Sequence, residues 1–389
     1  MKIAVCGPID TDLLRQRLGL KLDGAPAGMP GIAANIEIIE LRRRGFFVTA
    51  VTQDPSIDTP SRFDEGGLQL RFVPRRPRAR HRALDFFRRE IKYMAQELKD
   101  AEPDVVHAHW SYEFAMAGLR AGLPLVISCR DSPCDIFFQF GDPYRFVRLL
   151  MALTVFRRGQ VFAAVSPYVQ GRINWMLKGR CTVVPNGVDE SSIRRCPRTA
   201  IRRANPVLVT VGDSTRRKNV AAALKAFALI RREIPTAEFH LFGPGLTATD
   251  PGSADGVHPH GSRPYAEVQA FLNEKADLMI HPSLEEAFGW AIIEGMAAGL
   301  PVIAGSRAGG PPYVLGENMR QCLVDMRDPV AIASTAIHIL KDQGLYAHLA
   351  SQVIENVRER FTAQRMVDEF LSILEQAATE KNPKQEVLE

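Results

Sequence analysis

Short apolar segments alternate with helical stretches from one end of the chain to the other. This alternation is the βα rhythm of a parallel sheet with helices on both faces. In the first half it predicts strands at 2–6, 46–52, 68–73, 104–109, 125–129, 161–165 and 182–184. In the second half it predicts strands at 207–211, 238–242, 277–280, 302–304 and 322–324. The chain is therefore expected to have an α/β fold.

Residues 185–206 separate the two series of strands; they are rich in Arg, Pro and polar residues and have no apolar period. We therefore predict a Rossmann-like domain at 1–190, a linker at 191–205 and a second Rossmann-like domain at 206–362. The simplest architecture has two doubly wound parallel-sheet domains facing each other across a cleft, with ligands at the carboxyl ends of both sheets. The last residues, 379–389, are expected to form a frayed tail.

The composition fits two cored domains, because the chain has 389 residues of which 46% are hydrophobic. Its six cysteines are scattered without a Cys-x-x-Cys pair, and residues 1–7 have the pattern of a strand and not of a secretory signal. Reduced thiols and a cytoplasmic location are expected. No segment approaches the roughly 20 apolar residues that a spanning helix needs. An integral membrane protein is therefore not expected.

Lys and Arg outnumber Asp and Glu by 49 to 44, and the excess lies in the first half of the chain. It is concentrated at 71–92 and recurs at 144–158, where apolar residues interleave with arginines. Such a basic amphipathic stretch can lie on an anionic membrane surface, as in a peripheral membrane protein, or can be a charged helix face over the core. The residues leave both interpretations open. No nucleic-acid-binding motif accompanies the charge, so nucleic acid is not expected as a partner.

The most informative segment, 282–312, carries two acidic residues around a short helix. Glu286 lies just before a Phe-Gly turn, and Glu294 lies eight residues later inside a small-residue segment, 289–298, that predicts a helix closed by Gly299. The first turn of that helix leaves free N–H groups at the positive end of the helix dipole, which suits a diphosphate. The two carboxylates would flank this phosphate site and accept hydrogen bonds from hydroxyls. The alternative is a solvated helix with two surface acids.

This segment resembles the Glu-x7-Glu element of the retaining, group 1 glycosyltransferases of family 4, which have the GT-B fold. Glu286, Phe288, Gly289 and Glu294 match that element position by position. The resemblance implies that Glu286 and the amides after it hold the donor sugar and phosphates, and that Glu294 holds the ribose hydroxyls. It also implies that the helical stretch at 363–378 packs back on the first domain.

A basic loop after the first strand of the second domain is also predicted to bind the donor. The loop follows Gly212 and opens a helix, so Lys218 and a nearby Arg can neutralise a diphosphate leaving group. The family places a Lys six residues after this Gly, and Lys218 fits. It commonly has an Arg directly after the Gly, where this chain has Asp213. Arg217 or its neighbour Arg216 could replace that Arg, and a solvated basic loop is the alternative.

Glycines at other strand ends are further candidates for donor binding. Gly243 and the segment 258–263 end or follow strands of the second domain, where the nucleotide base would stack. Gly28 and Gly31 lie in a Gly-rich loop between the first strand and the first helix, where glycine lets the backbone approach a ligand closely. The glycine spacing of that loop is not a dinucleotide fingerprint. An ordinary flexible loop is the alternative.

His107 and His109 lie on the same side of a predicted strand, because they are two residues apart. The pair resembles the family's His-x-His strand end, which implies an acceptor-side position for His109. Hydrogen-bonded structural histidines are the simplest interpretation. A metal site is the alternative, and it would need a third ligand such as His258 or His260.

Arg130 stands where many members of the family carry a His near the reacting sugar carbon. A guanidinium cannot act as a general base, so Arg130 is expected to bind an anionic group, and Asp131 becomes the candidate acid or base. Asp10 and Asp12 form an Asp-x-Asp pattern that metal-dependent glycosyltransferases of another fold use. Directly after the first strand, this pattern is better interpreted as a helix cap or loop. No metal and no cofactor are expected.

The resemblance implies transfer of a hexose-type unit from a nucleoside diphosphate sugar to a hydroxyl of a carbohydrate or lipid-linked acceptor, with retention of anomeric configuration. Polysaccharide or glycolipid biosynthesis is the expected context. Lys218, a neighbouring Arg and the helix amides would stabilise the departing diphosphate, while Glu286 orients the sugar. Two rival functions are a sugar-nucleotide epimerase of the same architecture and a sugar-nucleotide-binding protein without activity. The second is motivated by Asp213 and Arg130, which replace expected residues.

Overall fold

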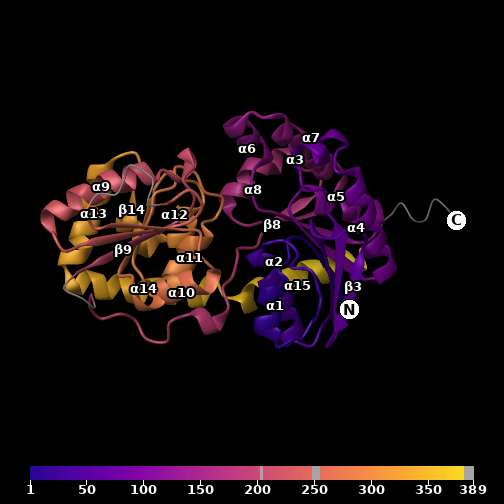
Figure 1. Cartoon of the computed structure of the whole chain (residues 1–389), viewed down its shortest axis with the longest axis horizontal. Helices are drawn as coiled ribbons and strands as arrows, with labels where there is room; N and C mark the ends of the chain where they lie inside the picture. Colours follow the sequence, from indigo (N-terminus) through magenta and orange to yellow (C-terminus); the bar gives the residue numbers. More distant parts are fainter. Residues whose placement is uncertain (202–204, 248–254, 381–389) are drawn as a thin grey trace. The chain divides into compact units, whose positions relative to one another are not determined.

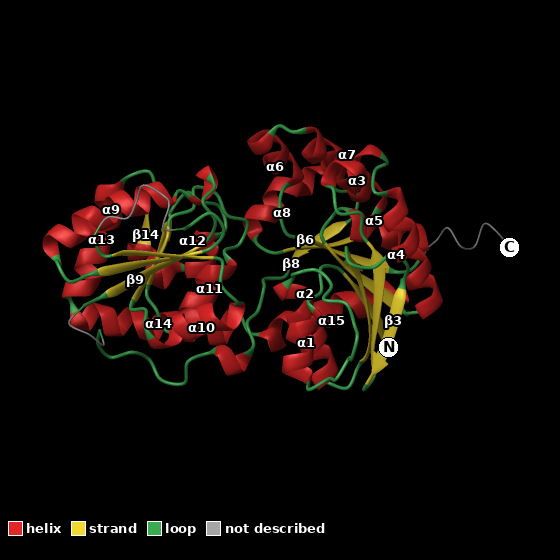
Figure 2. Cartoon of the chain, viewed as in Figure 1, coloured by secondary structure: helices red, strands yellow, loops and turns green. Residues whose placement is uncertain are grey.

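A computed structural model describes residues 1–201, 205–247 and 255–380 of the chain. The chain divides into two compact units, of which the first comprises Met1–Gly187 with Ala363–Glu389 and the second comprises Val188–Thr362. Each unit has its own sheet with helices packed against it (Figure 1, Figure 2). The expected α/β fold is therefore confirmed.

The sheet of the first unit contains, among the described residues, eight strands in the order β3-β4-β2-β1-β5-β6-β7-β8. All neighbouring pairs are parallel except β3 with β4. The strands are β1 (Lys2–Cys6), β2 (Phe47–Asp54), β3 (Ser61–Glu65), β4 (Leu68–Pro74), β5 (Val105–His109), β6 (Leu125–Cys129), β7 (Val161–Ala164) and β8 (Arg180–Val183). The central strands β1, β5 and β6 are almost entirely buried, as their apolar runs predict.

The C-terminal helix α15 (Ala363–Thr379) belongs to the first unit, where it contacts α2, β5 and β6 (Figure 1). Its apolar side chains at Met366, Val367 and Phe370 are buried. The other helices of this unit are α1 (Thr11–Leu18), α2 (Ile32–Arg43), α3 (Ala79–Leu84), α4 (Arg88–Ala101), α5 (Glu113–Ala121), α6 (Pro133–Phe140), α7 (Pro143–Arg158), α8 (Pro167–Ile173) and the 3-10 turn η1 (Asn174–Met176).

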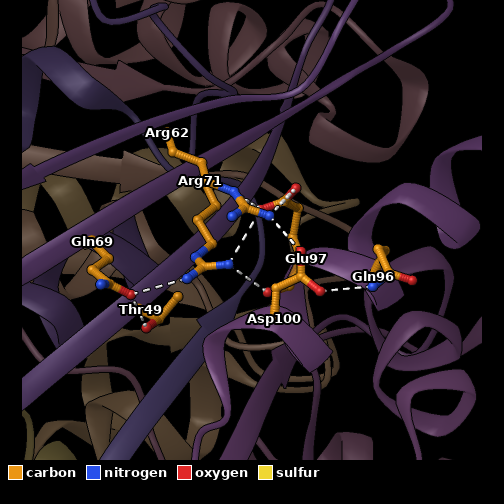
Figure 3. A network of polar contacts seen from close by, with 7 residues as sticks. All are labelled: Thr49, Arg62, Gln69, Arg71, Gln96, Glu97 and Asp100. Carbon is orange, nitrogen blue, oxygen red and sulfur yellow. Dashed lines mark hydrogen bonds and ion pairs between the residues drawn. The ribbon is translucent and has the colours of Figure 1, made fainter.

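Strand β3 was not predicted, because the segment Ser61–Glu65 has a single apolar residue and lies at the edge of the sheet. A polar network ties it to the core instead (Figure 3). Arg62 of β3 donates to Glu97 of α4 at 2.8 and 3.0 Å, and Arg71 of β4 lies 3.3 Å from the same carboxylate. Charge pairing at this edge therefore supplements the ring contact between Phe63 of β3 and Phe72 of β4, whose centroids lie 5.9 Å apart.

Replacing Glu97 by Gln is expected to destabilise the first unit. The Arg71 side chain is only 8% exposed, so its charge would lose its buried carboxylate partner. Removing one partner of a buried pair costs about 3 to 5 kcal/mol, and the melting temperature of this unit should fall by several degrees. The control is Arg62→Ala, whose side chain is 49% exposed and whose loss should cost about 1 kcal/mol or less. Equal melting curves for wild type and Glu97→Gln would contradict this account.

The second unit contains, among its described residues, a six-stranded, fully parallel sheet in the order β11-β10-β9-β12-β13-β14. In Figure 2, α9 and α13 lie over one face, and α10, α11 and α14 lie over the other. The strands are β9 (Val207–Val211), β10 (Glu238–Phe242), β11 (Val257–Gly261), β12 (Leu278–His281), β13 (Val302–Gly305) and β14 (Leu323–Val324). The helices are α9 (Val220–Glu233), α10 (Tyr265–Glu274), α11 (Trp290–Ala297), α12 (Pro311–Leu315), α13 (Pro329–Lys341) and α14 (Gln343–Arg360), with 3-10 turns η2 (Glu190–Ser192), η3 (Arg216–Lys218) and η4 (Glu317–Cys322).

Two features of the second unit differ from the sequence predictions. The segment around His258 forms the edge strand β11, although Pro259 and polar neighbours do not predict a strand; an edge strand tolerates proline because one side of it needs no ladder bonds. The described part of the expected linker, 191–201 and 205, lies in the second unit, where the Arg198 guanidinium donates to the carbonyls of Ala276 and Leu272 at 2.5 and 2.9 Å.

None of the described helices is both long and apolar enough to cross a membrane. The six cysteines are free thiols. The expected tail at 379–389 lies almost wholly outside the described residues, since the description ends at residue 380.

Candidate functional site

Two glycines shape the carboxyl end of the second sheet. Gly212 follows β9 and Gly243 follows the neighbouring strand β10, and a Cβ on Gly243 would lie 1.6 Å from the Gly212 carbonyl oxygen. Gly243 also has a φ of +139°, which L side chains rarely adopt. The Lys218 side chain runs along Gly212, with its Cδ 3.5 Å from where a Cβ would stand. These glycines let two loops and the lysine stem pack at one strand edge.

Lys218 and Glu286 form an ion pair at this edge, with 2.5 Å between Nζ and Oε2. Arg217 donates to the Glu285 carbonyl at 3.0 Å and lies 3.7 Å from the same Glu286 oxygen. Of the two arginines that the sequence left open, Arg217 is therefore the one at the carboxylate. Arg216 lines a separate cavity of about 280 Å³ beside α9. Asp213 accepts a hydrogen bond from the Thr215 amide at 3.0 Å, which stabilises the turn.

His281, at the end of β12, is a site residue that the sequence analysis missed. Its Nε2 lies 3.3 Å from Glu286 Oε2, and its side chain is almost fully buried. Burial raises the pKa of Glu286, but the hydrogen bond from His281 and the charge of Lys218 outweigh it and hold that pKa well below its usual value. Glu286 is therefore ionised at neutral pH. His281 is the last residue of its strand, and this position alone does not identify a functional residue in the sequence.

The backbone fixes Glu286 from both sides. Its amide donates to the Ala308 carbonyl at 2.7 Å, and its carbonyl accepts from the Gly310 amide at 2.8 Å. Three residues later, Gly289 has a φ of +99° and precedes helix α11 without a side-chain cap. The predicted helix with an uncapped first turn after Glu286 is thus present, and its leading amides can serve an anion. Phe288 is buried against Phe361, with ring centroids 5.6 Å apart, and anchors the turn.

Glu294 lies inside α11 and is 5% exposed. The Trp290 indole N–H donates to its Oε1 at 2.7 Å. Burial raises the pKa of Glu294 to about 7, against the hydrogen bonds of Tyr265 and Trp290, which lower it. The two carboxylates of the element thus differ in protonation at neutral pH. Glu286 has cationic partners that keep it ionised, whereas the hydrogen bonds to Glu294 come from neutral side chains.

Packing within the first unit explains why Gly28 and Gly31 are glycines. A Cβ on Gly28 would lie 2.2 Å from the Ile9 carbonyl oxygen, and one on Gly31 would lie 2.1 Å from the Pro8 carbonyl oxygen. The Gly28 amide donates to Asp54 at 2.6 Å. These contacts hold the loop against the chain that follows β1, so it is ordered and not merely a flexible connection.

His107 and His109 share a buried partner, Glu37 of α2, which the sequence analysis missed. The two imidazoles lie 2.7 and 2.8 Å from its two carboxylate oxygens. Burial raises the pKa of Glu37, but the histidines outweigh it and keep that pKa well below its usual value. Burial lowers the pKa of His109 to about 3. The sequence signal for this partner was the position of Glu37 between isoleucines, which indicates a buried helix face. A carboxylate buried there needs a partner.

Arg130 is held by the protein itself. Its guanidinium bonds to Asn186 and lies 2.9 Å from His109 Nδ1, while its Nε is buried without a hydrogen-bond partner. Asp131 accepts a hydrogen bond from the Tyr112 hydroxyl at 2.8 Å, and burial raises its pKa. His109 ends β5, and Arg130 and Asp131 follow β6, which is the neighbouring strand, so the three residues lie at one edge of the sheet.

The Asp-x-Asp pattern after β1 is a helix cap, as predicted. Asp10 is the N-cap of α1 and accepts hydrogen bonds from the Asp12 and Leu13 amides at 3.0 and 3.2 Å. Asp12 pairs with Arg15 at 2.8 Å one turn later. Both carboxylates therefore have structural partners.

Comparison with known proteins gives matches over most of the chain. Residues 38–192 match the family model described as Glycosyltransferase Family 4, and residues 197–360 match the one described as Glycosyl transferases group 1. The N-acetyl-alpha-D-glucosaminyl L-malate synthase of Bacillus anthracis is 25% identical over 72% of this chain and 76% of its own length. The lipopolysaccharide core biosynthesis glycosyltransferase LpsD of Rhizobium meliloti is 27% identical over 45% of this chain and 51% of its own length.

Among solved structures, the Anabaena protein Alr3699/HepE in complex with UDP-glucose is similar with a TM-score of 0.69 at 19% identity. The match covers 97% of this chain and 100% of that one. At this identity the similarity concerns the fold, which has two units with mostly parallel sheets.

Proposed function

Since this chain belongs to the group 1 glycosyltransferases of family 4, with the GT-B fold, we propose that it moves a sugar from a nucleoside diphosphate sugar to an acceptor hydroxyl with retention of configuration. One observation carries the proposal: Lys218 and Glu286, from loops after adjacent strands, pair at the carboxyl end of the second sheet. Donor-type ligands bind at this edge in doubly wound folds.

The chemistry follows from the charges at that edge. Lys218, Arg217 and the first amides of α11 would bind the diphosphate and stabilise the negative charge that develops as the sugar–oxygen bond breaks. Ionised Glu286 would accept hydrogen bonds from the sugar hydroxyls, and Glu294 from the ribose. Because no protein nucleophile is assigned, retention requires the acceptor oxygen to attack from the face that the diphosphate leaves. The acceptor proton can then pass to the departing phosphate oxygen.

The first unit is assigned to the acceptor, with His109, Arg130 and Asp131 as the candidate residues. The buried Arg130 Nε without a partner would suit an anionic or polar acceptor group. Gly28 and Gly31 are assigned to the donor on the family resemblance. A Cβ at either position would clash with the backbone. An alanine variant of Gly28 or Gly31 can therefore test donor binding only after its fold has been checked.

The acceptor is proposed to be a carbohydrate or a lipid-linked sugar, in polysaccharide or glycolipid biosynthesis. Helices α3 and α6 both pack on α7 (Figure 1), and the three helices expose large apolar side chains. Leu84 and Phe138 are 82% and 81% exposed, and Phe140 and Phe146 are also exposed. The exposed Arg80 lies on α3, and the Arg145 guanidinium lies 4.6 Å from the Phe140 ring centroid. Apolar side chains beside cations match an anionic bilayer surface.

The wild-type chain is expected to float with vesicles that contain an anionic lipid and to remain unbound with neutral vesicles. The double variant Leu84→Ser/Phe138→Ser should partition at least tenfold less, because inserting each side chain contributes about 1.5 to 3 kcal/mol. Val330→Ser is the matched control, since Val330 is 64% exposed but lies in the second unit. Equal flotation of all three chains, or none, would remove the membrane surface from the proposal.

The transfer itself is tested in two steps. A thermal-shift screen against UDP-, GDP- and ADP-sugars identifies the donor, and NMR of the product gives its anomeric configuration. Conversion of the donor without any acceptor would favour an epimerase, and binding without turnover over a broad acceptor panel would favour an inactive binding protein. An inverted product would contradict the proposed mechanism.

A further inference from the structure

A cluster of histidines lies on one face of β10 and β11 in the second unit. The two strands are parallel neighbours, and His240 is the register partner of His258. Because side chains alternate along a strand, Glu238 and His240 share one face of β10, and His258 and His260 share one face of β11. The register therefore brings one carboxylate and three imidazoles together.

The sequence suggested two roles for His258 and His260: a third metal ligand beside His107 and His109, or part of the segment 258–263 where the nucleotide base would stack. The structure instead groups them with His240 and Glu238. The Glu238, His240 and His258 ligand atoms lie within 4.8 Å of one another. His240 Nε2 is 3.3 Å from Glu238 Oε2, and its ring stacks on that of His258 with centroids 4.6 Å apart. Ligand atoms around a tetrahedral zinc lie roughly 3.3 to 3.6 Å apart, given bonds of about 2.0 to 2.2 Å. The His240–Glu238 pair already has this spacing, and a small side-chain adjustment would bring in His258, whose ligand atom lies within 4.8 Å of the other two.

The hydrogen bond between His240 and His260 determines which ring nitrogen of His240 can bind a cation. Its Nδ1 lies 2.8 Å from His260 Nε2. If Nδ1 carries the proton and donates to His260, then Nε2 presents a lone pair to the Glu238 carboxylate. Two acceptors then face each other, and a cation between them would satisfy both. Metal-bound histidines commonly donate from their second nitrogen in this way, which fixes the tautomer.

We propose that Glu238, His240 and His258 form a binding site for a divalent transition metal of the zinc class, with His260 as the positioning residue that orients His240. Three protein ligands leave a fourth position open to water. Imidazole with carboxylate is a donor set suited to zinc and not to magnesium or calcium, which prefer oxygen ligands.

The surroundings allow an ion to enter. Glu238, His240 and His260 line a cavity of about 610 Å³ whose wall also includes Arg263, Glu267, Glu274 and Lys275. His258 is exposed. Phe242 and Phe271 pack against the rings and keep them in place.

The other three-residue cluster, Glu37 with His107 and His109, lacks these properties. It is fully buried, both carboxylate oxygens already bond to the imidazoles, and the Arg130 guanidinium lies 2.9 Å from His109. A fixed cation at that distance opposes a second one. Metal binding is therefore assigned to the cluster in the second unit.

A metal here would clamp the edge strand β11 to β10. Phe242 and Gly261, the last residues of the two strands, are also paired across the ladder, one residue before Gly243. The ion would therefore stabilise the strand pair whose carboxyl end borders the proposed donor site.

Equilibrium dialysis of the untagged, metal-free full chain against Zn²⁺ tests the site. We expect one bound Zn²⁺ per chain, a higher melting temperature with Zn²⁺, and a tetrahedral cobalt spectrum when Co²⁺ replaces it. His258→Gln should weaken Zn²⁺ binding at least tenfold, since even outer partners change affinity by about 10- to 100-fold. His348→Gln is the control, because His348 is exposed on α14 in the same unit.

The positioning role of His260 has its own test. His260→Ala should weaken Zn²⁺ binding, whereas His260→Gln, which keeps an acceptor for the His240 N–H, should restore part of the affinity. Binding that is unchanged in His258→Gln, or absent in wild type, would overturn the proposal. If wild type shows neither Zn²⁺ binding nor a thermal shift while sugar transfer proceeds, the metal site fails and the proposed function stands.

Discussion

Lys218→Ala is expected to lower the turnover number for sugar transfer by about 10²- to 10³-fold, the usual cost of removing one group that stabilises developing negative charge. The lysine Nζ lies 2.5 Å from Glu286, so the pair is assembled before any donor arrives. When the diphosphate departs, the ammonium group can shift its interaction toward the phosphate. The fold should persist, because Glu286 keeps His281 at 3.3 Å and Arg217 at 3.7 Å.

The measurement is release of the nucleoside diphosphate in the presence of acceptor, with circular dichroism to confirm folding. Arg216→Ala is the matched control, because this neighbouring cation lines a separate cavity and should change turnover little. Glu286→Gln should also lose activity, and the double variant should lose less than the two single losses combined, since the residues act as a unit. Near-normal turnover of a folded Lys218→Ala chain would refute the assignment of this residue.

The Lys218–Glu286 pairing shows how far the sequence alone could lead. The two residues are 68 positions apart, but apolar runs predicted the strands before them, and β9 and β12 are neighbours in the sheet. Side chains after adjacent parallel strands meet at the same edge, so topology supplies the contact. His281 was missed because a buried histidine at a strand end has no signature of its own until its partner is placed.

Arg130 and β11 show what sequence reasoning leaves out. That Arg130 binds an anionic group stays a prediction, but the bonds of its guanidinium to Asn186 and His109 were not predicted, because such contacts depend on side-chain directions that no local pattern encodes. Strand β11 has a polar sequence with a proline, and its existence depends on pairing with β10. Patterns of apolar residues predict elements that bury themselves in the core, and they miss elements that tertiary pairing creates.

The apparent affinity for the nucleotide sugar is expected to rise as the pH increases from 6 to 8. Glu294 has a pKa raised to about 7 by burial, so it changes charge within this range. In our proposal it accepts hydrogen bonds from the ribose hydroxyls, and a carboxylate accepts them more strongly than a neutral acid. One pH unit below the pKa only about a tenth of the sites are ionised, so binding should be roughly tenfold weaker at pH 6 than at its plateau. Glu286, whose pKa lies far lower, stays ionised throughout.

Glu294→Gln provides the control, because glutamine has nearly the same shape but does not titrate. Its donor affinity should be independent of pH between 6 and 8 and weaker than wild type at pH 8, by about 1.5 to 3 kcal/mol if a charged hydrogen bond is lost. Calorimetry with the intact nucleotide sugar avoids the titration of a terminal phosphate. A wild-type affinity that is flat across this range, or a Glu294→Gln chain that keeps the same slope, would contradict the role of Glu294.

The pH dependence of folding stability tests the protonation of Glu294 independently of donor binding. The folded pKa of Glu294 lies above the unfolded value of 4.5, so the folded chain binds the extra proton between these two values. Its contribution to stability is therefore fully present below pH 4.5 and is lost as the pH rises through about 7. Without donor, the advantage of Glu294→Gln over wild type should thus increase from pH 5 to pH 8, on the order of 3 kcal/mol for a shift of this size. Donor at saturating concentration should reduce that difference in the wild type, because the ribose hydroxyls then stabilise the ionised carboxylate.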